Sequence, residues 1–105
     1  MSDDIEYIDM NDELEETETF QLESEIKCIL LKDGTYIISK VEEIIADYGM
    51  PNCKLINPKQ ILNDGSKLLP WPKYREQIEI LVSSDNFLTI YDPDARVLKE
   101  YHELF

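Results

Sequence analysis

The sequence predicts a mainly β fold: a small, strongly bent, five-stranded antiparallel barrel with a C-terminal helix and an acidic N-terminal arm. Three observations lead to this prediction. Short runs rich in β-branched residues alternate with turn signals such as Asp33-Gly34 and Asp85-Asn86, which suit tight hairpins. Apolar residues recur at helical spacing near the C-terminus, and acidic residues gather at the N-terminus. At 105 residues the chain has room for one domain.

The acidic arm is defined by its charge. The first 25 residues carry eleven Asp or Glu and no Lys or Arg, so residues 26–105 retain a net charge of only −2. Few apolar residues lie among these like charges, which predicts disorder over residues 1–24, or at most a short helix at 11–17. The arm either keeps the protein soluble or occupies a cationic groove, its own or a partner's.

The first predicted hairpin carries the barrel prediction. Residues 26–31 are apolar at nearly every position, as expected of a strand covered on both faces. After Asp33-Gly34, residues 35–45 form a second strand that is long enough to bend, and the small Ser39 in its middle suits a sharp bend. A bent strand is what turns the corner of a small barrel.

The third strand is predicted over Cys53, Leu55 and Asn57 and is broken by Pro58, which cannot donate to a sheet ladder. Ile61 and Leu62 either continue this strand or cap the core. A loop is expected from residue 63 to about residue 75. It holds Trp71 between two prolines, among basic and aromatic neighbours. Such a segment either grips a single nucleic-acid strand by stacking and charge or packs as a corner of the fold.

Two more strands and a helix complete the predicted domain, residues 25–105. The strands are residues 78–82 and 87–91, expected to form a second hairpin. The helix is expected over 93–104, with Asp92 as its N-cap and Pro93 at its first position, where no amide donor is needed. Its apolar stripe predicts that it lies across an open end or flank of the sheet.

The sequence does not predict an enzyme, a metal site or a cofactor. It has no Ser-His-Asp set, metal-ligand spacing or phosphate-binding glycine loop, and its single histidine, His102, suits a favourable charge near a helix C-terminus. Cys28 and Cys53 are expected to be reduced and buried. Because we find neither a signal peptide nor a membrane-length apolar run, we expect a soluble, cytoplasmic protein without membrane contact.

Two stretches resemble the motifs of the Sm, LSm and Hfq family. The run from Leu31 to Val41, with a hairpin-turn Gly34 and Ser39 at the bend, is similar to the first Sm motif. Asn52-Cys53-Lys54-Leu55 is similar to the Asn-x-x-Leu that closes that motif, and residues 80–87 lie where the second motif is expected. The likeness is greatest to small Sm-like proteins encoded by marine cyanophages, which would place the protein in the host cytoplasm.

The resemblance implies an Sm-like, or SH3-like, barrel that binds RNA or single-stranded DNA. Carried over by position, Met50 would stack on a base, Asn52 would hydrogen-bond its edge, and Ser83 stands where the family has a covering Arg. Tyr48 stands in place of the family's usual Asp. The predicted nucleic-acid-binding residues are Tyr48, Met50, Asn52, Lys54, Ser83, Asn86, Lys67, Lys73, Tyr74 and Arg75.

The resemblance also implies a homo-oligomeric ring, in which the fourth strand of one subunit pairs with the fifth strand of the next. Apolar edge strands left bare are an aggregation hazard, which independently favours such pairing. The predicted interface residues are Leu81, Val82, Phe87, Leu88, Ile90 and Tyr91. The alternative function is a non-catalytic scaffold ring whose acidic arm contacts a basic protein as a nucleic-acid mimic.

Overall fold

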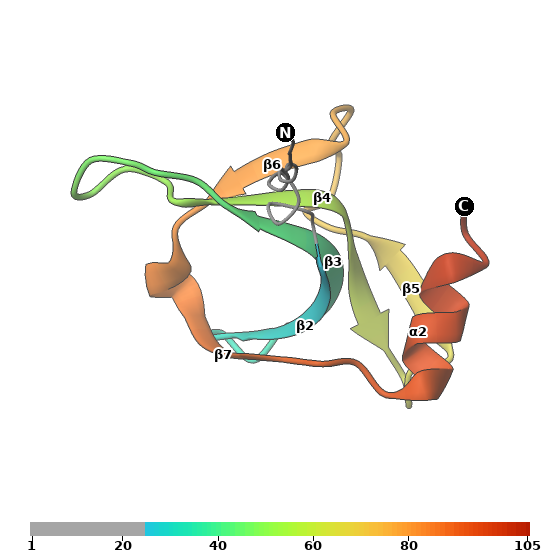
Figure 1. Ribbon diagram of the computed structural model, residues 1–105. Coiled ribbons are helices and arrows are strands. Elements are labelled where there is room, and N and C mark those ends of the chain that lie inside the picture. The colour runs from blue at the N-terminus through green and yellow to red at the C-terminus, as the bar shows by residue number, and fades with distance from the viewer. Residues whose placement is uncertain (1–24) are drawn as a thin grey trace, which may run out of the picture.

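The computed structural model describes residues 25–105, shown in Figure 1. The predictions of disorder over residues 1–24 and of a short helix at 11–17 lie outside the described residues. The elements are β2 (Glu25–Leu31), β3 (Tyr36–Glu43), β4 (Cys53–Leu62), β5 (Lys67–Pro70), β6 (Glu79–Val82), the short 3-10 helix η1 (Ser84–Asn86), β7 (Phe87–Tyr91) and helix α2 (Ala95–His102). None of the described helices is long and apolar enough to cross a membrane.

The strands form one antiparallel sheet, which confirms a mainly β fold with a C-terminal helix. Its order is β5-β4-β3-β2-β7, and β6 also pairs with β4. The sheet curls around its interior (Figure 1), but β6 and β7 are not paired with each other and the sheet is open. The predicted second hairpin is therefore wrong: β7 pairs with β2, while β6 pairs with β4.

Strand β4 is longer than predicted and is not broken at Pro58. It runs for ten residues, pairing with β6 through its first half and with β5 through its second. The pairing of β3 with β4 shifts register between Ile38 and Lys40, and Asn57 has a positive φ of 53°. This irregularity lets the strand continue through a residue that has no amide proton.

Strand β5 was missed because only two apolar residues mark it within the segment predicted as a loop. Lys67–Pro70 pairs with the end of β4. The predicted bend residue, Ser39, is fully buried at the β3–β4 register shift. Its hydroxyl lies 3.1 Å from the Ile56 carbonyl oxygen and 2.8 Å from the Lys40 carbonyl oxygen, to which it donates. A small side chain is thus placed where the two strands approach each other most closely.

Apolar side chains form two clusters, one on each face of β2. The inner cluster fills the concave side of the sheet, and its buried members are Ile29, Leu31, Ile37 and Leu55. The outer cluster joins Cys28 and Ile38 to Val97 and Tyr101 of α2. The prediction that β2 is covered on both faces is consistent with this arrangement, in which the helix supplies the second cover.

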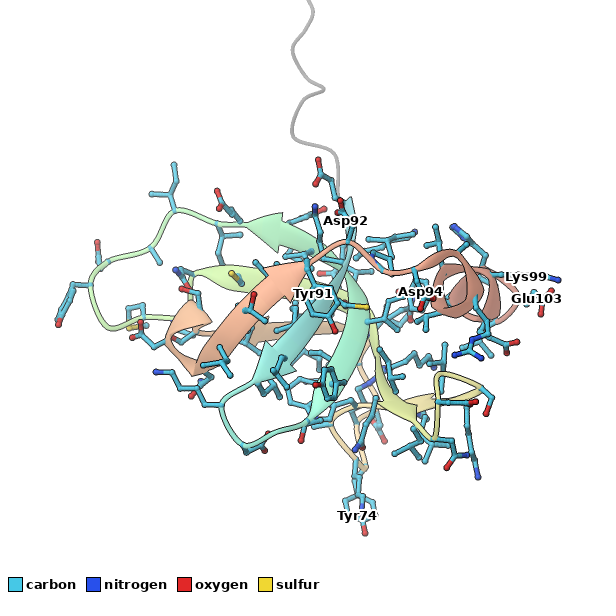
Figure 2. The ribbon with its side chains drawn as sticks, turned by 90° about the horizontal axis from the view of Figure 1, so that it is seen from below. Tyr74, Tyr91, Asp92, Asp94, Lys99 and Glu103 are labelled. Atoms are coloured by element: carbon cyan, nitrogen blue, oxygen red, sulfur yellow. The ribbon has the colours of Figure 1, made fainter. Side chains whose placement is uncertain are left out.

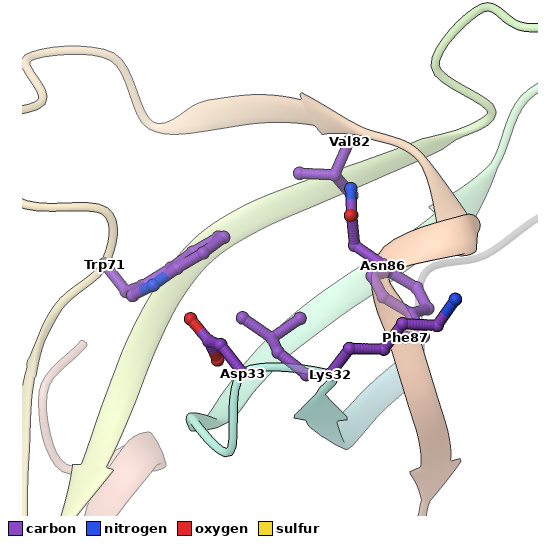
Figure 3. A pocket seen from close by; sticks show the side chains of 7 residues that line it. Lys32, Asp33, Trp71, Val82, Asn86 and Phe87 are labelled. Atoms are coloured by element: carbon purple, nitrogen blue, oxygen red, sulfur yellow. The ribbon is translucent and has the colours of Figure 1, made fainter.

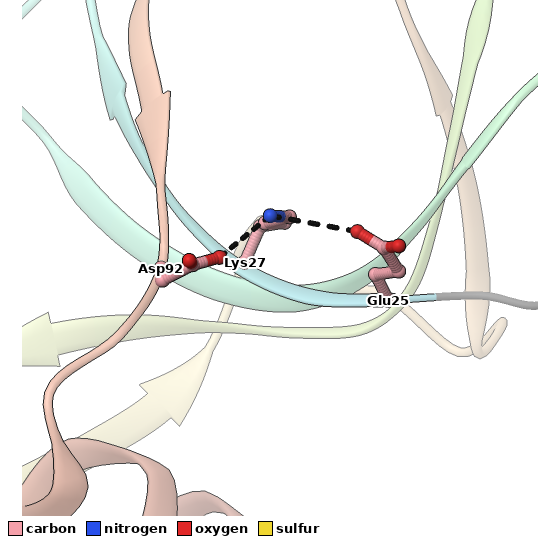
Figure 4. A network of polar contacts seen from close by, with 3 residues as sticks. All are labelled: Glu25, Lys27 and Asp92. Atoms are coloured by element: carbon pink, nitrogen blue, oxygen red, sulfur yellow. Dashed lines mark hydrogen bonds and ion pairs between the residues drawn. The ribbon is translucent and has the colours of Figure 1, made fainter.

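Helix α2 begins two residues later than predicted. Asp94, rather than Asp92, is the N-cap, and its Oδ1 accepts a hydrogen bond of 2.9 Å from the Val97 amide. Asp92 instead accepts a 2.6 Å hydrogen bond from Lys27 Nζ, which also lies 3.4 Å from Glu25 (Figure 4). These carboxylates raise the pKa of Lys27. They tie the start of β2 to the segment that leads into the helix.

Both cysteines are free and buried, as predicted. Burial raises the pKa of Cys28, with a further contribution from the charge of Asp94. Burial and the charge of Glu43 raise the pKa of Cys53 in the same way. Thiols in such surroundings are mainly protonated near neutral pH and behave as small apolar side chains.

Tyr101 connects the helix to the sheet. The side chain is only 1% exposed, and its hydroxyl donates to the carbonyl oxygens of Ile56 and Asn57 at 3.1 and 3.0 Å. Those carbonyls lie at the irregular part of β4, beside the register shift between β3 and β4. The hydroxyl therefore adds a donor to partly buried backbone acceptors as well as anchoring the helix.

We predict that Tyr101→Phe lowers the free energy of unfolding by about 0.5–1.5 kcal/mol, because it removes this hydrogen bond while keeping the packed ring. Urea denaturation followed by circular dichroism measures the change. Tyr74→Phe is the matched control, since Tyr74 is 99% exposed. Equal stability of the two variants would contradict an anchoring role for the Tyr101 hydroxyl.

Candidate functional site

Four of the predicted binding residues come together at one pocket. The loop between β3 and β4, residues 44–52, projects from the sheet (Figure 1) and faces the turn that contains η1. We call the space between them the loop pocket; its volume is about 270 Å³. Its lining residues are Ala46, Asp47, Tyr48, Gly49, Met50, Asn52, Ser83 and Asp85.

Asn52 connects the loop between β3 and β4 to the end of β6 and to Ser84 at the start of η1. Its backbone amide donates to the Val82 carbonyl at 3.1 Å, and its carbonyl accepts from the Ile44 amide at 3.0 Å. Its side-chain amide bonds Ser84 in both directions: Nδ2 donates to the hydroxyl at 2.9 Å, and Oδ1 accepts from the backbone amide at 2.8 Å. One amide proton and one lone pair of the side chain remain available to a ligand.

The outer wall of the loop pocket is apolar and aromatic. Tyr48 is fully exposed and Met50 more than half exposed, although both are large side chains that are usually covered. Gly49 has a φ of +86°, a conformation that suits glycine and closes the turn between them. A planar ligand could therefore stack on the exposed Tyr48 ring at the rim of a pocket that Asn52 also lines.

The charge at the loop pocket is negative. Asp47 and Asp85 line it, and none of its described lining residues is Lys or Arg. Lys54, predicted to help bind nucleic acid, lies on β4 between Glu42 and Glu79, at 3.7 and 3.5 Å from their carboxylates. Because these acids offset its charge, Lys54 supplies little attraction for a phosphate.

The basic and aromatic segment, residues 67–75, does not line the loop pocket. Trp71 packs against the inner cluster, as a corner residue would. The Arg75 guanidinium donates to three carbonyl oxygens, those of Trp71, Gln77 and Pro58, at 3.0, 2.8 and 3.1 Å. Tyr74 extends away from the sheet (Figure 2), and Lys67 and Lys73 are exposed. The segment is mainly a corner of the fold that the packing of Trp71 and the hydrogen bonds of Arg75 hold in place.

Asn86 lies at a different pocket, shown in Figure 3, with a volume of about 310 Å³. We call it the apolar pocket, because Leu31, Trp71, Val82 and Phe87 form most of its wall. Lys32, Asp33 and Asn86 complete its lining. Asp33 accepts a hydrogen bond from the Thr35 amide at 2.9 Å, which lowers the pKa of the Asp33 carboxyl.

The predicted interface residues divide into two groups. Leu81, Leu88, Ile90 and Tyr91 are exposed, with Leu88 at 64%. Val82 and Phe87 are partly buried and pack against the inner cluster, so they contribute to the core of the subunit. Leu81 and Val82 point to opposite faces of β6, whereas β7 exposes consecutive residues from Leu88 to Tyr91.

The sequence does not predict how two further residues contribute to the loop pocket. Asp85 lines it, and Ser84 is hydrogen-bonded to the side chain of Asn52. The available signal is the Ser83-Ser84 pair itself, because a serine hydroxyl can accept a hydrogen bond. Within residues 25–105, no group of three or more His, Cys, Asp or Glu side chains is arranged to hold a metal ion.

Comparisons with known proteins place most of the chain in one family. Residues 24–105 match the model of a family of unknown function (DUF6561). No curated protein matches the chain. The match covers every element described above, and the acidic residues 1–23 lie outside it.

We predict that Asn52→Ala lowers the free energy of unfolding by about 1–3 kcal/mol, because it leaves two partly buried groups of Ser84 without partners. Asn52→Asp keeps an acceptor for the Ser84 amide and should cost less. Chemical denaturation measures both. Gln60→Ala is the control, because the side-chain amide of Gln60 makes no hydrogen bond within the described residues. If Asn52→Ala were as stable as this control, the hydrogen bonds of the Asn52 side chain would not stabilise the fold.

Proposed function

Since the chain belongs to the DUF6561 family, whose function is unknown, we propose its role from its own geometry: a non-catalytic, Sm-like module that forms a homo-oligomeric ring and acts as a binding scaffold. One observation carries the proposal. Strands β6 and β7 each pair on one side only within the described residues, and both expose apolar side chains.

The open edges argue for pairing between copies. Leu81 on β6 and Leu88 and Ile90 on β7 are exposed although they lie on ordered strands. An edge of this kind presents unpaired amide and carbonyl groups together with apolar surface, which natural proteins usually cover. Joining β6 of one copy to β7 of the next would satisfy both edges at once, and repetition of the same contact would close a ring.

The strand order supports an Sm-like identity for the module. A tight turn at Gly34, a buried small residue at the bend of β3 and a short turn between β6 and β7 lie at the positions that the resemblance requires. The helix after the last strand departs from that family, which usually carries one before its first strand. In this protein α2 covers the outer cluster on the convex side of the sheet.

The charge of the loop pocket favours a basic protein partner. Asp47 and Asp85 line it without a neighbouring cation among its described lining residues, so a phosphate would be repelled and a Lys or Arg side chain attracted. The acidic arm adds ten further carboxylates in residues 1–24. Both features suit a scaffold that a basic partner recognises.

A second candidate function is the binding of RNA or single-stranded DNA. It is favoured because one pocket is lined by the exposed Tyr48 ring, which can stack on a base, and by the Asn52 amide, which can hydrogen-bond to a base edge. Stacking does not need a local cation, but the negative pocket would repel the phosphate backbone. Binding would therefore be weak and would lack the steep loss of affinity with salt that lysine or arginine contacts to phosphates cause.

We predict that the full-length protein has an oligomer mass at micromolar concentration and that Leu88→Lys combined with Ile90→Lys shifts it toward the monomer. The lysines would place charges on the edge that pairs. Light scattering coupled to size-exclusion chromatography measures the mass. Leu104→Lys is the control, since Leu104 is similarly exposed but lies beyond α2. A wild-type monomer would overturn the ring.

For the nucleic-acid candidate, we expect weak binding at an ionic strength that screens the acidic pocket. Tyr48→Ala should weaken this binding by about 1–3 kcal/mol, the usual contribution of one stacked base. Fluorescence anisotropy with U-rich RNA, A-rich RNA and single-stranded DNA measures it. Tyr74→Ala is the control because Tyr74 is equally exposed but remote from the loop pocket. Absence of binding to all three probes would leave only the protein scaffold.

A further inference from the structure

The apolar pocket lies at the seam where the sheet stays open. Val82 belongs to β6 and Phe87 to β7, two strands that do not pair with each other, and both side chains line the pocket. Leu31, a buried member of the inner cluster, and Trp71, which packs against that cluster, complete the apolar wall. The volume of about 310 Å³ reaches the range of cavities that bind small molecules, which begins near roughly 300 Å³. The inner cluster is thus accessible to a ligand at this seam.

Hydrogen bonds hold both walls of the apolar pocket in place. On one side, the Trp71 amide donates to the Pro58 carbonyl at 3.1 Å, and the Trp71 carbonyl accepts from Arg75 Nε at 3.0 Å. On the other side, the Lys32 amide donates to the Asn86 carbonyl at 3.0 Å, which joins the turn after β2 to η1. The pocket is therefore largely pre-formed, which reduces the ordering that a ligand must cause.

The polar side chains of the apolar pocket differ in how they are bonded. The Asp33 carboxylate is engaged within its own turn, where it accepts from the Thr35 amide at 2.9 Å and has a lowered pKa for that reason. By contrast, three donors make no hydrogen bond or ion pair within residues 25–105: the Lys32 ammonium, the Asn86 side-chain amide and the Trp71 indole N–H. The groups left available to a ligand are therefore mainly donors.

Figure 3 shows how these groups are arranged. Trp71 and the Asp33 carboxylate lie on one side of the pocket, and Phe87 lies on the other with Lys32 and Asn86. An anionic group is favoured on the side of the Lys32 ammonium, where it would also meet the Asn86 amide. A second anionic group on the opposite side would be repelled by Asp33, and the apolar wall between the two sides favours an uncharged body.

We propose that the apolar pocket binds a small monocarboxylate whose body is aromatic or otherwise apolar. The carboxylate accepts hydrogen bonds from the Lys32 ammonium and the Asn86 amide, and the body packs between Trp71 and Phe87. A ligand of this class matches the charge at one side of the pocket and the apolar wall at the same time. The inference goes beyond the scaffold role and depends neither on ring formation nor on a basic partner at the loop pocket.

The fluorescence of Trp71 tests the proposal without a label, because Trp71 is the only tryptophan in the chain and lines the pocket. We expect phenylacetate to change the emission of the full-length protein saturably at millimolar concentration, as suits a ligand of about ten non-hydrogen atoms. 2-Phenylethanol keeps the ring but lacks the charge, and should bind about two- to fivefold more weakly, the usual effect of one exposed ion pair. Acetate, which lacks the apolar body, should leave the emission unchanged.

Three variants separate the charged contact from the apolar one. Lys32→Gln should weaken phenylacetate binding about two- to fivefold and leave 2-phenylethanol binding unchanged, because only the ion pair is lost. Lys99→Gln is the matched control: it makes the same change in net charge at an exposed position on α2, outside the pocket, and should bind both probes as the wild type does. Val82→Phe places a larger side chain in the pocket and should abolish binding of both probes, with circular dichroism confirming that the variant folds.

Nuclear magnetic resonance identifies the place of binding. Phenylacetate should shift the amide resonances of residues 31–33, 82 and 86–87 together with the indole N–H of Trp71. Shifts confined to another part of the protein would overturn the proposal, as would phenylacetate that changes neither the emission nor the resonances. Equal affinity for phenylacetate and 2-phenylethanol, unaffected by Lys32→Gln, would also overturn it, since the pocket would then accept apolar groups without regard to charge.

Discussion

The structure depends on how the backbone carbonyl groups in the irregular part of β4 are hydrogen-bonded. β4 pairs with three other strands, so its course determines where β3, β5 and β6 lie. Between Ile56 and Lys59 the pairing of β4 with β3 shifts register. Side-chain donors from elsewhere lie within hydrogen-bonding distance of the carbonyl oxygens there: Ser39 and Tyr101 at Ile56, Tyr101 at Asn57, and Arg75 at Pro58. Since an unpaired buried carbonyl is costly, these donors keep the strand continuous and set its bend.

This bend also explains how α2 and the residue 70–78 corner are attached. Tyr101 brings the helix to the convex face, and Arg75 brings the corner that holds Trp71 over the inner cluster. A body of about 80 residues buries only about 60–65% of its unfolded surface, so polar anchors of this kind and a partner at the open edges both add to a limited core. Packing of the helix and pairing of the sheet edges would thus both add buried apolar area to a small core.

Charge is unevenly distributed over the molecule. The loop pocket carries Asp47 and Asp85, and none of its described lining residues is Lys or Arg. The near-neutral total of residues 26–105 therefore conceals a negative loop end. A scaffold that attracts a basic partner at this end is consistent with the charge.

The sequence alone determined the parts of the fold that local chemistry controls. The Asp33-Gly34 turn, the doubly covered β2, the small residue at the bend and the apolar stripe of the helix follow from turn preference and periodicity. Only the tertiary structure decided the partners. In the tertiary structure β4 continues through Pro58, and β6 and β7 pair with different strands. Val82 and Phe87 pack against the inner cluster, and the Asn52 side chain is hydrogen-bonded to Ser84. Those outcomes depend on which distant strand or donor is nearby, and single-sequence patterns do not contain that information because pairing joins residues far apart in the chain.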